Sequence, residues 1–395
     1  MSTIPDISTF QNRRTPFYLY DMDLLERTVR HLKELAAQYN IKVNYAVKAN
    51  NETPLLEIIS KAGFGADCVS GNEVLRAAEE GFRDITFAGV GKTDREISDA
   101  LESGVCCFIT ESLQELEVID AIVGSRISAF GQGLPPGGRK AGIIIRINPN
   151  IDAHTHKFIT TGLSENKFGI LPEDIPEAMA ALRKCKNLEF RGLHMHIGSQ
   201  ITELDVYGEE CRKMSELVLK VEEEGFKVRR LSLGGGLGVD YENPLQNSIP
   251  DFRGWLSMID SNITRREGME IHIEPGRSIV AQCGTLISRV LYIKEGHTRN
   301  FAVLDAGMND LIRPALYGSY HKIDNLSAEA RGESEIRTYD IVGPVCESSD
   351  TFGTDRELPL TRRGDLIAIR TAGAYGAVMS SNYNLKDKAE SIYVR

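Results

Sequence analysis

The first 280 or so residues of this 395-residue chain alternate short apolar runs with stretches of helical periodicity. Eight of these runs have the length of buried strands, and most of the gaps between them carry apolar residues at a helical spacing. The runs are 43–47, 63–69, 85–89, 107–110, 142–148, 190–197, 228–236 and 270–274. Eight strand–helix units in about 250 residues are typical of a (β/α)8 TIM barrel. A doubly wound open sheet is the alternative fold.

Polar residues at the ends of these runs favour the barrel. Lys48, Asp67, Arg146, His196 and Glu274 all lie at or near the C-terminal end of a predicted strand. In a barrel those ends converge on one mouth, where active sites lie. In an open sheet the same residues would be spread along an edge. Only a barrel therefore brings these polar residues together at one site.

The pattern changes after about residue 280 to strand-like runs with little helix between them. The segment 15–21 near the N-terminus has the same character. We therefore predict an all-β domain, sandwich-like or barrel-like, formed by residues 1–21 and 282–395, and a barrel formed by residues 22–281. The expected strands of the all-β domain include 284–294, 300–307, 336–343, 365–373 and 391–395. The Pro- and Gly-rich segment 127–140 predicts a surface excursion within the barrel.

Charge and composition narrow the function classes. The net charge of −10 argues against a nucleic-acid-binding protein. No apolar segment reaches membrane-spanning length, and the N-terminus lacks the apolar core of a secretory signal. The seven cysteines are odd in number and include no C-x-x-C pair, so no disulfide framework or structural zinc site is indicated. We expect a cytoplasmic protein that binds neither nucleic acid nor membrane.

Three features suggest chemistry, and each has a plainer alternative. Lys48 is either a surface lysine or an amine at the mouth of a pocket. The glycines at 234–236 are either a flexible turn or a cradle of backbone N–H groups for an anion. A buried Glu274 needs a partner, which is either Arg277 or a cationic ring nitrogen. A lysine, a phosphate cradle and such a carboxylate together describe a pyridoxal phosphate site.

The two histidines of H-x-H allow another interpretation. His194 and His196 lie on one face of a strand and could bind a metal. A metal site would need further ligands and would leave Lys48 without a role, so we predict no metal. In the cofactor interpretation, His196 stacks flat on the ring.

Several motifs resemble a known family. Y-A-V-K-A-N (45–50), H-I-G-S-Q (196–200), G-G-G-L-G (234–238) and E-P-G-R (274–277), in this order and spacing, resemble the alanine-racemase-type (fold type III) pyridoxal phosphate-dependent decarboxylases. Four more motifs resemble the members that convert meso-2,6-diaminopimelate to L-lysine and CO2. These are T-T-G-L-S-E-N-K-F-G-I (160–170), D-A-G-M-N-D-L-I-R-P-A-L-Y (305–317), G-P-V-C-E-S-S-D (343–350) and A-Y-G-A-V-M-S-S-N-Y-N (374–384). The resemblance covers nearly the whole chain.

The resemblance implies a role for each matching residue. Lys48 forms the imine with the cofactor and later takes part in proton transfer, and Cys346 donates a proton to the substrate carbon. The implied pyridoxal 5'-phosphate-binding residues are Lys48, Asp67, Arg146, His196, Ser199, Gly235, Gly236, Glu274, Gly276, Arg277 and Tyr375. The implied substrate-binding residues are Arg277, Arg313, Tyr317, Glu347 and Tyr375. The resemblance also implies a head-to-tail homodimer in which the C-E-S-S-D loop completes the partner's site.

The chemistry of the substrate agrees with these roles. Arg277 and Arg313 can each bind a carboxylate through two parallel hydrogen bonds, and Glu347 can accept from the distal ammonium group. Ornithine and lysine lack the second carboxylate, so an arginine kept for it would stay unpaired. The rival interpretations are a decarboxylase of lysine, ornithine or a polyamine precursor, a metal-dependent barrel hydrolase, and a pyridoxal phosphate carrier without activity.

Overall fold

The computed structural model describes residues 7–105, 107–130, 140–149 and 167–395. Most of the predicted excursion at 127–140, and part of the motif at 160–170, lie outside these residues. The chain divides into two compact units. We call 29–238 with 251–276 the barrel unit, and 1–28 with 239–250 and 277–395 the sheet unit. The boundaries predicted from the sequence, 22–281 and 1–21 with 282–395, stay a prediction.

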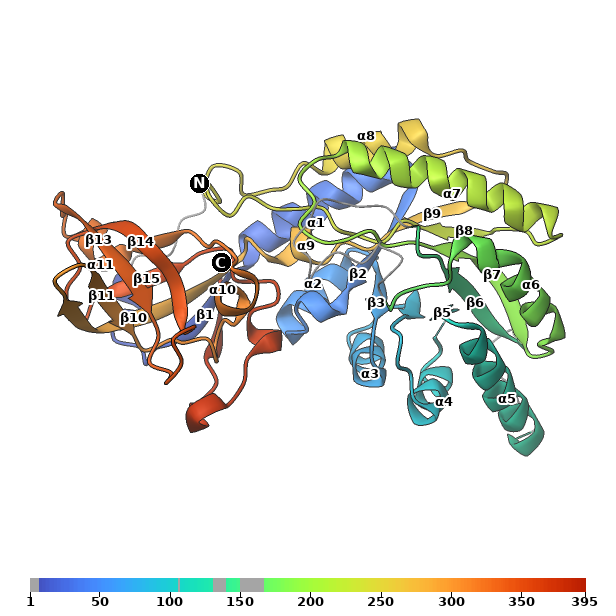
Figure 1. Ribbon diagram of the computed structural model, residues 1–395, viewed down its shortest axis with the longest axis horizontal. Coiled ribbons are helices and arrows are strands. Elements are labelled where there is room, and N and C mark those ends of the chain that lie inside the picture. The colour runs from blue at the N-terminus through green and yellow to red at the C-terminus, as the bar shows by residue number, and fades with distance from the viewer. Residues whose placement is uncertain (1–6, 106, 131–139, 150–166) are drawn as a thin grey trace. The chain divides into compact units, whose positions relative to one another are not determined.

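The barrel unit confirms the (β/α)8 fold. Within its described residues, eight strands pair in parallel in chain order, and the first closes on the last through pairs such as Val43 with Ile273 (Figure 1). The open sheet is therefore excluded. The strands are β2 (Ile41–Ala46), β3 (Gly65–Cys68), β4 (Ile85–Phe87), β5 (Cys107–Thr110), β6 (Ala141–Arg146), β7 (Leu188–His194), β8 (Arg230–Ser232) and β9 (Glu270–Ile273).

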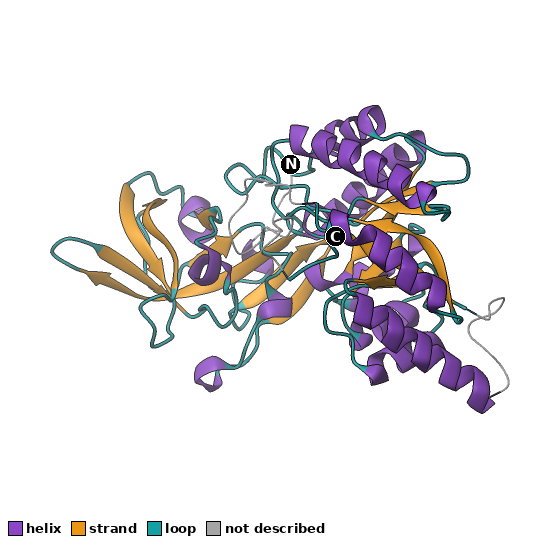
Figure 2. Cartoon of the chain, turned by 45° about the vertical axis from the view of Figure 1, so that its right-hand side comes forward, coloured by secondary structure: helices purple, strands orange, loops and turns teal. Residues whose placement is uncertain are grey.

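Helices alternate with these strands and surround them (Figure 2). Helix α1 (Met22–Gln38) follows the predicted apolar spacing, and its Leu24, Leu25 and Leu32 are buried. The other helices of this part of the chain are α2 (Thr53–Lys61), α3 (Gly71–Glu79), α4 (Asp94–Glu102), α5 (Leu113–Phe130), α6 (Ile175–Lys184), α7 (Asp205–Glu223) and α8 (Phe252–Asn262). Parallel strands covered by helices are buried on both faces, which explains why β6 reads as the apolar run A-G-I-I-I before it ends at Arg146.

The sheet unit is mostly sheet, as predicted, with a few short helices. Its main sheet has the order β12-β15-β10-β11-β13-β14, and β1 pairs with both β10 and β16. The predicted contribution of the N-terminal strand to this domain is thus confirmed. The strands are β1 (Phe17–Asp21), β10 (Gly284–Glu295), β11 (Asn300–Leu304), β12 (Ile323–Asn325), β13 (Ile336–Val342), β14 (Thr351–Pro359), β15 (Leu366–Ile369) and β16 (Glu390–Val394).

The long strand β10 organises the sheet unit. Its first part pairs antiparallel with β1 and β15, and its last part pairs with β11 after a shift in register between Val290 and Tyr292. Apolar side chains from these strands pack with the N-terminal segment, and Phe17, Ile287 and Ala368 in this cluster are completely buried. One strand thus joins the N-terminal segment to the C-terminal sheet.

Two strands of the sheet unit were not predicted from the sequence. Strands β12 and β14 are the two ends of the main sheet. Strand β14 reads T-F-G-T-D-R-E-L-P, and its middle residues are exposed. Charged residues are common on edge strands because they discourage pairing with other chains, and they remove the apolar run that identifies a strand. The sheet unit also contains the short helices α9 (Arg277–Val280), α10 (Arg313–Tyr317) and α11 (Leu326–Ala330).

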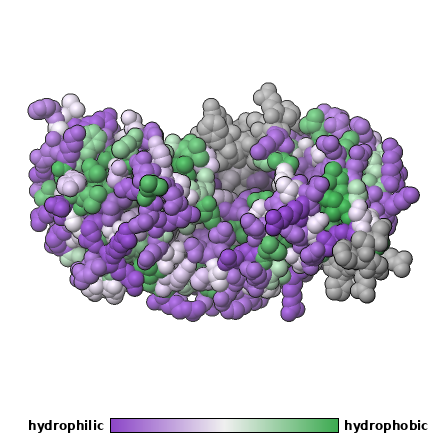
Figure 3. Space-filling model, turned by 90° about the horizontal axis from the view of Figure 1, so that it is seen from below, coloured by the Kyte–Doolittle hydropathy of each residue, from purple (hydrophilic) through white to green (hydrophobic). Residues whose placement is uncertain are grey.

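The surface carries mainly hydrophilic side chains on the face drawn in Figure 3, where hydrophobic residues form small separate patches. None of the helices in the described part of the chain has the length and apolar character needed to cross a membrane.

Candidate active site

The barrel strands bring several predicted residues to their C-terminal ends. Lys48 lies in the single turn Val47–Ala49 directly after β2, and Asp67 lies within the last residues of β3. Arg146 is the last residue of β6, and Glu274 follows β9 directly. Because the strands are parallel and the barrel is closed, these ends share one mouth.

Lys48 is paired with a buried carboxyl group. Its Nζ lies 4.0 Å from Oδ2 of Asp67, and 39% of the lysine side chain is exposed against 3% for the aspartate. Burial and the nearby negative charge of Glu274 raise the pKa of Asp67 to about 8, although Lys48 acts to lower it. The Oδ1 atom of Asp67 has no hydrogen-bond partner among the described residues. This oxygen is available to a bound molecule.

The raised pKa of Asp67 predicts a pH-dependent stability. The folded protein retains a proton that the unfolded chain releases above its ordinary pKa of 3.8, so this residue lowers stability as pH rises from about 4 to about 8. Asp67→Asn should therefore raise the midpoint of thermal unfolding, with a gain roughly threefold larger at pH 8 than at pH 5. Calorimetry at both pH values measures the difference.

Asp84→Asn is the matched control because the pKa of Asp84 is shifted the other way. Burial acts to raise that pKa, but Arg230 and a hydrogen bond from Asn44 hold it below its ordinary value. This variant should lose stability at pH 8. An Asp67→Asn gain of the same size at both pH values would contradict the prediction.

Glu274 is buried and held by two partners from neighbouring strands. His194 Nε2 lies 2.9 Å from its Oε2, and Ser232 Oγ donates to its Oε1 at 2.6 Å. Burial acts to raise the pKa of Glu274, but His194, Ser232 and Arg230 together hold it below its ordinary value. The residue is therefore a fixed carboxylate. These partners differ from the ion pair with Arg277 that the sequence left open.

The glycine run follows β8 and cannot carry side chains without displacing its neighbours. A Cβ atom at Gly235 would lie 2.2 Å from the carbonyl oxygen of Glu274, and one at Gly236 would lie 2.6 Å from that of Gly198. Gly236 also has a φ of +104°, which side-chain-bearing residues rarely adopt. The backbone at the end of β8 is thus kept bare, as an anion cradle requires. A Cβ at Gly276 would lie 2.9 Å from that of Ala49, beside the Lys48 turn.

His196 and Ser199 lie in the loop after β7, and both are half-buried. Burial and the positive charges of Lys48 and Arg146 lower the pKa of His196 well below its ordinary value, so the ring is neutral. Its Nδ1 accepts a hydrogen bond from the Gly235 N–H at 3.4 Å. The histidine is therefore tied to the glycine run.

His194, the other member of H-x-H, is bound to Glu274 instead. No cluster of three or more His, Cys, Asp or Glu side chains in the described ranges is arranged to hold a metal ion.

Arg146 is held by a residue that the sequence did not assign to the site. Its Nη1 donates to both oxygens of Glu111, at 3.0 and 3.2 Å, and its guanidinium lies 4.5 Å from the Phe168 ring centre. Glu111 also accepts from the backbone N–H of Gly169. The sequence feature that could have identified Glu111 is its position directly after β5, at the end of a barrel strand.

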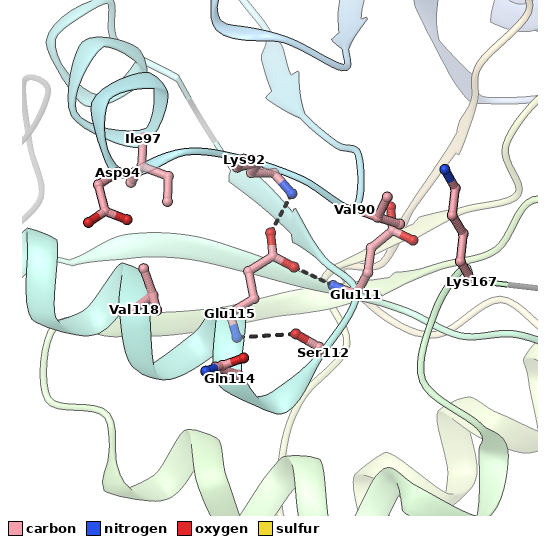
Figure 4. A pocket seen from close by; sticks show the side chains of 10 residues that line it. All are labelled: Val90, Lys92, Asp94, Ile97, Glu111, Ser112, Gln114, Glu115, Val118 and Lys167. Carbon is pink, nitrogen blue, oxygen red and sulfur yellow. Dashed lines mark hydrogen bonds and ion pairs between the residues drawn. The ribbon is translucent and has the colours of Figure 1, made fainter.

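A hollow of about 280 Å³ is lined by Glu111 and by residues of the segments that follow β4 and β5. Figure 4 shows Lys92 and Glu115 at its centre. Lys92 is almost completely buried, and its Nζ donates to the carbonyl oxygens of Gly89 and Ile109 and to Glu115 at 2.5 Å. These bonds use all three hydrogens of the ammonium group, so Lys92 is a structural clamp between two βα loops.

The sheet unit holds a separate group of predicted residues around two buried arginines. Arg277 and Arg313 are 5% and 4% exposed. Arg277 Nη1 donates to the hydroxyl of Tyr241 at 2.7 Å, and the Arg313 guanidinium lies 4.9 Å from the centre of the same ring. Tyr375 places its ring 4.9 Å from the Arg277 guanidinium, with a backbone φ of +55°. Tyr317 ends α10 and is half-buried.

The C-E-S-S-D loop (346–350) is anchored by its buried Asp350, while its first residues are exposed. The buried carboxylate of Asp350 accepts from the backbone N–H groups of Val345 and Met308, at 2.6 and 2.7 Å. Cys346 and Glu347 are exposed. The Tyr383 hydroxyl donates to Glu347 at 2.6 Å. The loop therefore presents a thiol and a carboxylate outward in a fixed shape.

The residues of the barrel mouth fit pyridoxal phosphate. Lys48 supplies an amine, Glu274 a permanent carboxylate, and Gly235 and Gly236 a bare backbone at a strand end. The orphaned Oδ1 of Asp67 is a further polar atom without a protein partner among the described residues. A buried oxygen of this kind is costly unless a bound molecule satisfies it. We conclude that the donor set suits this cofactor.

Comparison with known proteins agrees with this chemistry. The pyridoxal binding domain of pyridoxal-dependent decarboxylases matches residues 22–281. A diaminopimelate decarboxylase from Bacteroides thetaiotaomicron is 45% identical over 390 residues, which cover 98% of this chain and 97% of that protein. The crystal structure of diaminopimelate decarboxylase from Helicobacter pylori complexed with L-lysine has a TM-score of 0.89 and 39% identity, covering 98% of this chain and 93% of that one.

A decarboxylase of lysine or ornithine was the main alternative function, and a solved structure of such an enzyme is less similar to this chain. The crystal structure of lysine/ornithine decarboxylase from Vibrio vulnificus complexed with putrescine has a TM-score of 0.82, with 98% of this chain and 96% of that chain covered. Its identity of 23% shows a common fold alone. The higher identities, 45% and 39%, cover 97% and 93% of the two diaminopimelate decarboxylases. This chain belongs to the diaminopimelate decarboxylase family of pyridoxal-dependent decarboxylases.

Proposed function

We propose that this protein decarboxylates meso-2,6-diaminopimelate to L-lysine and CO2 with pyridoxal 5'-phosphate as cofactor. The substrate has two amino-acid ends, and the enzyme must remove one carboxylate while it keeps the other. The family relationship supports the reaction. The observation that supports this substrate is the pair of buried arginines, Arg277 and Arg313.

Arg277 and Arg313 supply two buried positive charges for the carboxylate that is kept. The hydrogen-bond partners that the described residues give Arg313 are His321 and Ser319, which leave its charge uncompensated. A buried charge without a counter-charge is costly, so this site favours a ligand with a second carboxylate. We propose that the β-domain predicted at residues 1–21 and 282–395 completes the substrate site through Arg313, with Tyr317 and Tyr375 as further contacts.

The barrel residues act at the other end of the substrate. Lys48 would hold the cofactor, Glu274 would face its ring nitrogen, and His196 would lie flat against the ring. Ser199, Gly235, Gly236, Gly276, Arg277 and Tyr375 would bind the phosphate, while Asp67 and Arg146 would orient groups near the ring. When bound, pyridoxal phosphate draws electrons from the bond to the departing carboxylate. Lys48 would also accept or return a proton at its Nζ, which lies 4.0 Å from Oδ2 of Asp67.

Cys346 and Glu347 complete the proposed machinery from a second copy of the chain. Cys346 would give a proton to the carbon that has lost CO2, and Glu347 would accept from the distal ammonium group. Both side chains are exposed on the fixed C-E-S-S-D loop, as groups that serve a partner subunit must be. We therefore propose a homodimer with shared active sites. A cytoplasmic location is consistent with the cysteines of the described residues, which form no disulfides with one another.

A substrate panel tests the proposed function. Purified protein supplied with pyridoxal phosphate should release CO2 from meso-2,6-diaminopimelate. The kcat/KM for L-lysine and L-ornithine should be lower by at least about 100-fold, because each lacks the second carboxylate that we propose for the Arg313 charge. Release of CO2 from each compound under identical conditions measures this. Faster turnover of ornithine or lysine would refute the proposal.

A further inference from the structure

We propose that Tyr241 and His321 are a positioning pair that holds Arg277 and Arg313 for the retained carboxylate of the substrate. This inference rests on the proposed function, which assigns both arginines to that carboxylate. Neither Tyr241 nor His321 has a role in the chemistry described above. Both lie in the sheet unit with the arginines.

Tyr241 contacts both arginines with different parts of one side chain. Its hydroxyl accepts the hydrogen bond from Arg277 Nη1 at 2.7 Å, while the face of its ring lies 4.9 Å from the guanidinium of Arg313. Tyr241 itself is 9% exposed. A rigid, buried ring between two cations fixes their separation, since neither arginine can shift without losing a contact. The spacing of the two guanidinium groups is therefore set by Tyr241.

His321 holds Arg313 from another direction. The imidazole is completely buried and packs edge-on against the Tyr241 ring, with centroids 5.1 Å apart and planes at 77°. Its Nδ1 lies 2.8 Å from the carbonyl oxygen of Arg370, and its Nε2 lies 2.9 Å from Nη1 of Arg313.

These two contacts select one form of the imidazole. A carbonyl only accepts, so Nδ1 carries the hydrogen. A guanidinium only donates, so Nε2 must offer a lone pair. His321 is thus neutral, in agreement with burial and the charge of Arg313, which lower its pKa to about 3.

A neutral acceptor at this place has a specific consequence for binding. A carboxylate in the position of His321 would orient Arg313 equally well but would cancel its charge. The imidazole orients the guanidinium and leaves the charge to the ligand. The Ser319 hydroxyl, 3.3 Å from Nη2, does the same. Tyr241 and His321 therefore orient the two guanidinium groups without neutralising their charge.

The test compares two ligands that differ in one group. L-lysine keeps the distal carboxylate, whereas cadaverine lacks it. Tyr241→Phe removes only the hydroxyl, and His321→Leu removes the acceptor. In the cofactor-loaded enzyme, each variant should raise KM for meso-2,6-diaminopimelate and the dissociation constant of L-lysine by about tenfold, the effect of losing one hydrogen bond to a charged group. The kcat and the dissociation constant of cadaverine should stay within about twofold.

Two further variants serve as controls. His321→Gln keeps a neutral acceptor and should recover part of the affinity for L-lysine. Tyr292→Phe alters an exposed tyrosine that stacks with Arg363 in the same unit and should change nothing. Thermal unfolding of each variant checks that it is folded.

Ligand binding is read from the cofactor absorbance, so it does not depend on turnover. A parent enzyme that binds L-lysine but releases no CO2 from meso-2,6-diaminopimelate would defeat the proposed function alone. The positioning role is overturned if Tyr241→Phe and His321→Leu bind L-lysine as the parent does. It is also overturned if they weaken cadaverine and L-lysine equally, or if the parent does not prefer L-lysine to cadaverine.

Discussion

Lys48→Ala should yield a folded protein without the visible absorbance of bound pyridoxal phosphate and with turnover reduced by at least about a thousandfold. Lys48 is the amine at the end of β2, 4.0 Å from Asp67 in the same mouth as Glu274. Its removal would take away both the proposed point of attachment of the cofactor and the proposed proton-transfer group. Absorbance spectra and borohydride trapping measure the loss of the attached cofactor, and CO2 release measures the loss of turnover.

Lys42→Ala is the control for this variant, because Lys42 is an exposed lysine on the same strand. It should retain colour and activity. If Lys48→Ala keeps a borohydride-trappable cofactor, another lysine carries it and the assignment is wrong. If the colour is lost but turnover remains, the reaction does not use the cofactor in the proposed way.

Cys346→Ala should lower turnover by about 100-fold or more while the cofactor absorbance stays unchanged. The thiol is the proposed proton donor to the substrate carbon and has no part in holding the cofactor. Cys185→Ala, which changes a half-buried cysteine after α6, is the matched control and should be fully active. Full turnover by Cys346→Ala would exclude the donor role.

Mixing the two inactive variants tests whether the site is shared between subunits. In a mixed dimer of Lys48→Ala and Cys346→Ala, one of the two sites would have both Lys48 and a partner's Cys346. Random exchange of subunits should then restore about a quarter of the parent activity. If both residues act within one chain, every site stays defective and the mixture remains inactive.

The backbone of this protein could be predicted closely because its signals are local. The apolar run A-G-I-I-I and the helical spacing of Leu24, Leu25 and Leu32 each depend on neighbouring residues, and both elements are present. Strand β14 was not predicted because its position on an edge relaxes the need for apolar residues. Local patterns thus describe buried elements better than edges.

The contacts of the site were harder to predict because they join distant parts of the sequence. Arg277 was a possible partner of Glu274 because it lies only three positions further along the sequence. The structure pairs Glu274 with His194 and Ser232, which the barrel brings to adjacent strands. The residues near Tyr241 and His321 in the sequence do not predict their contacts with Arg277 and Arg313.

The closure of the barrel also governs when the site can first exist. Strand β2, which carries Lys48 at its end, pairs with β9, which precedes Glu274, although almost the whole barrel sequence lies between them. During translation the lysine leaves the ribosome early, and the strand that closes the ring comes last. Until β9 emerges, β2 and β8 are open edges with unpaired backbone groups. Lys48 is therefore made early in synthesis, but it shares a barrel mouth with the Glu274 carboxylate only after the ring has closed.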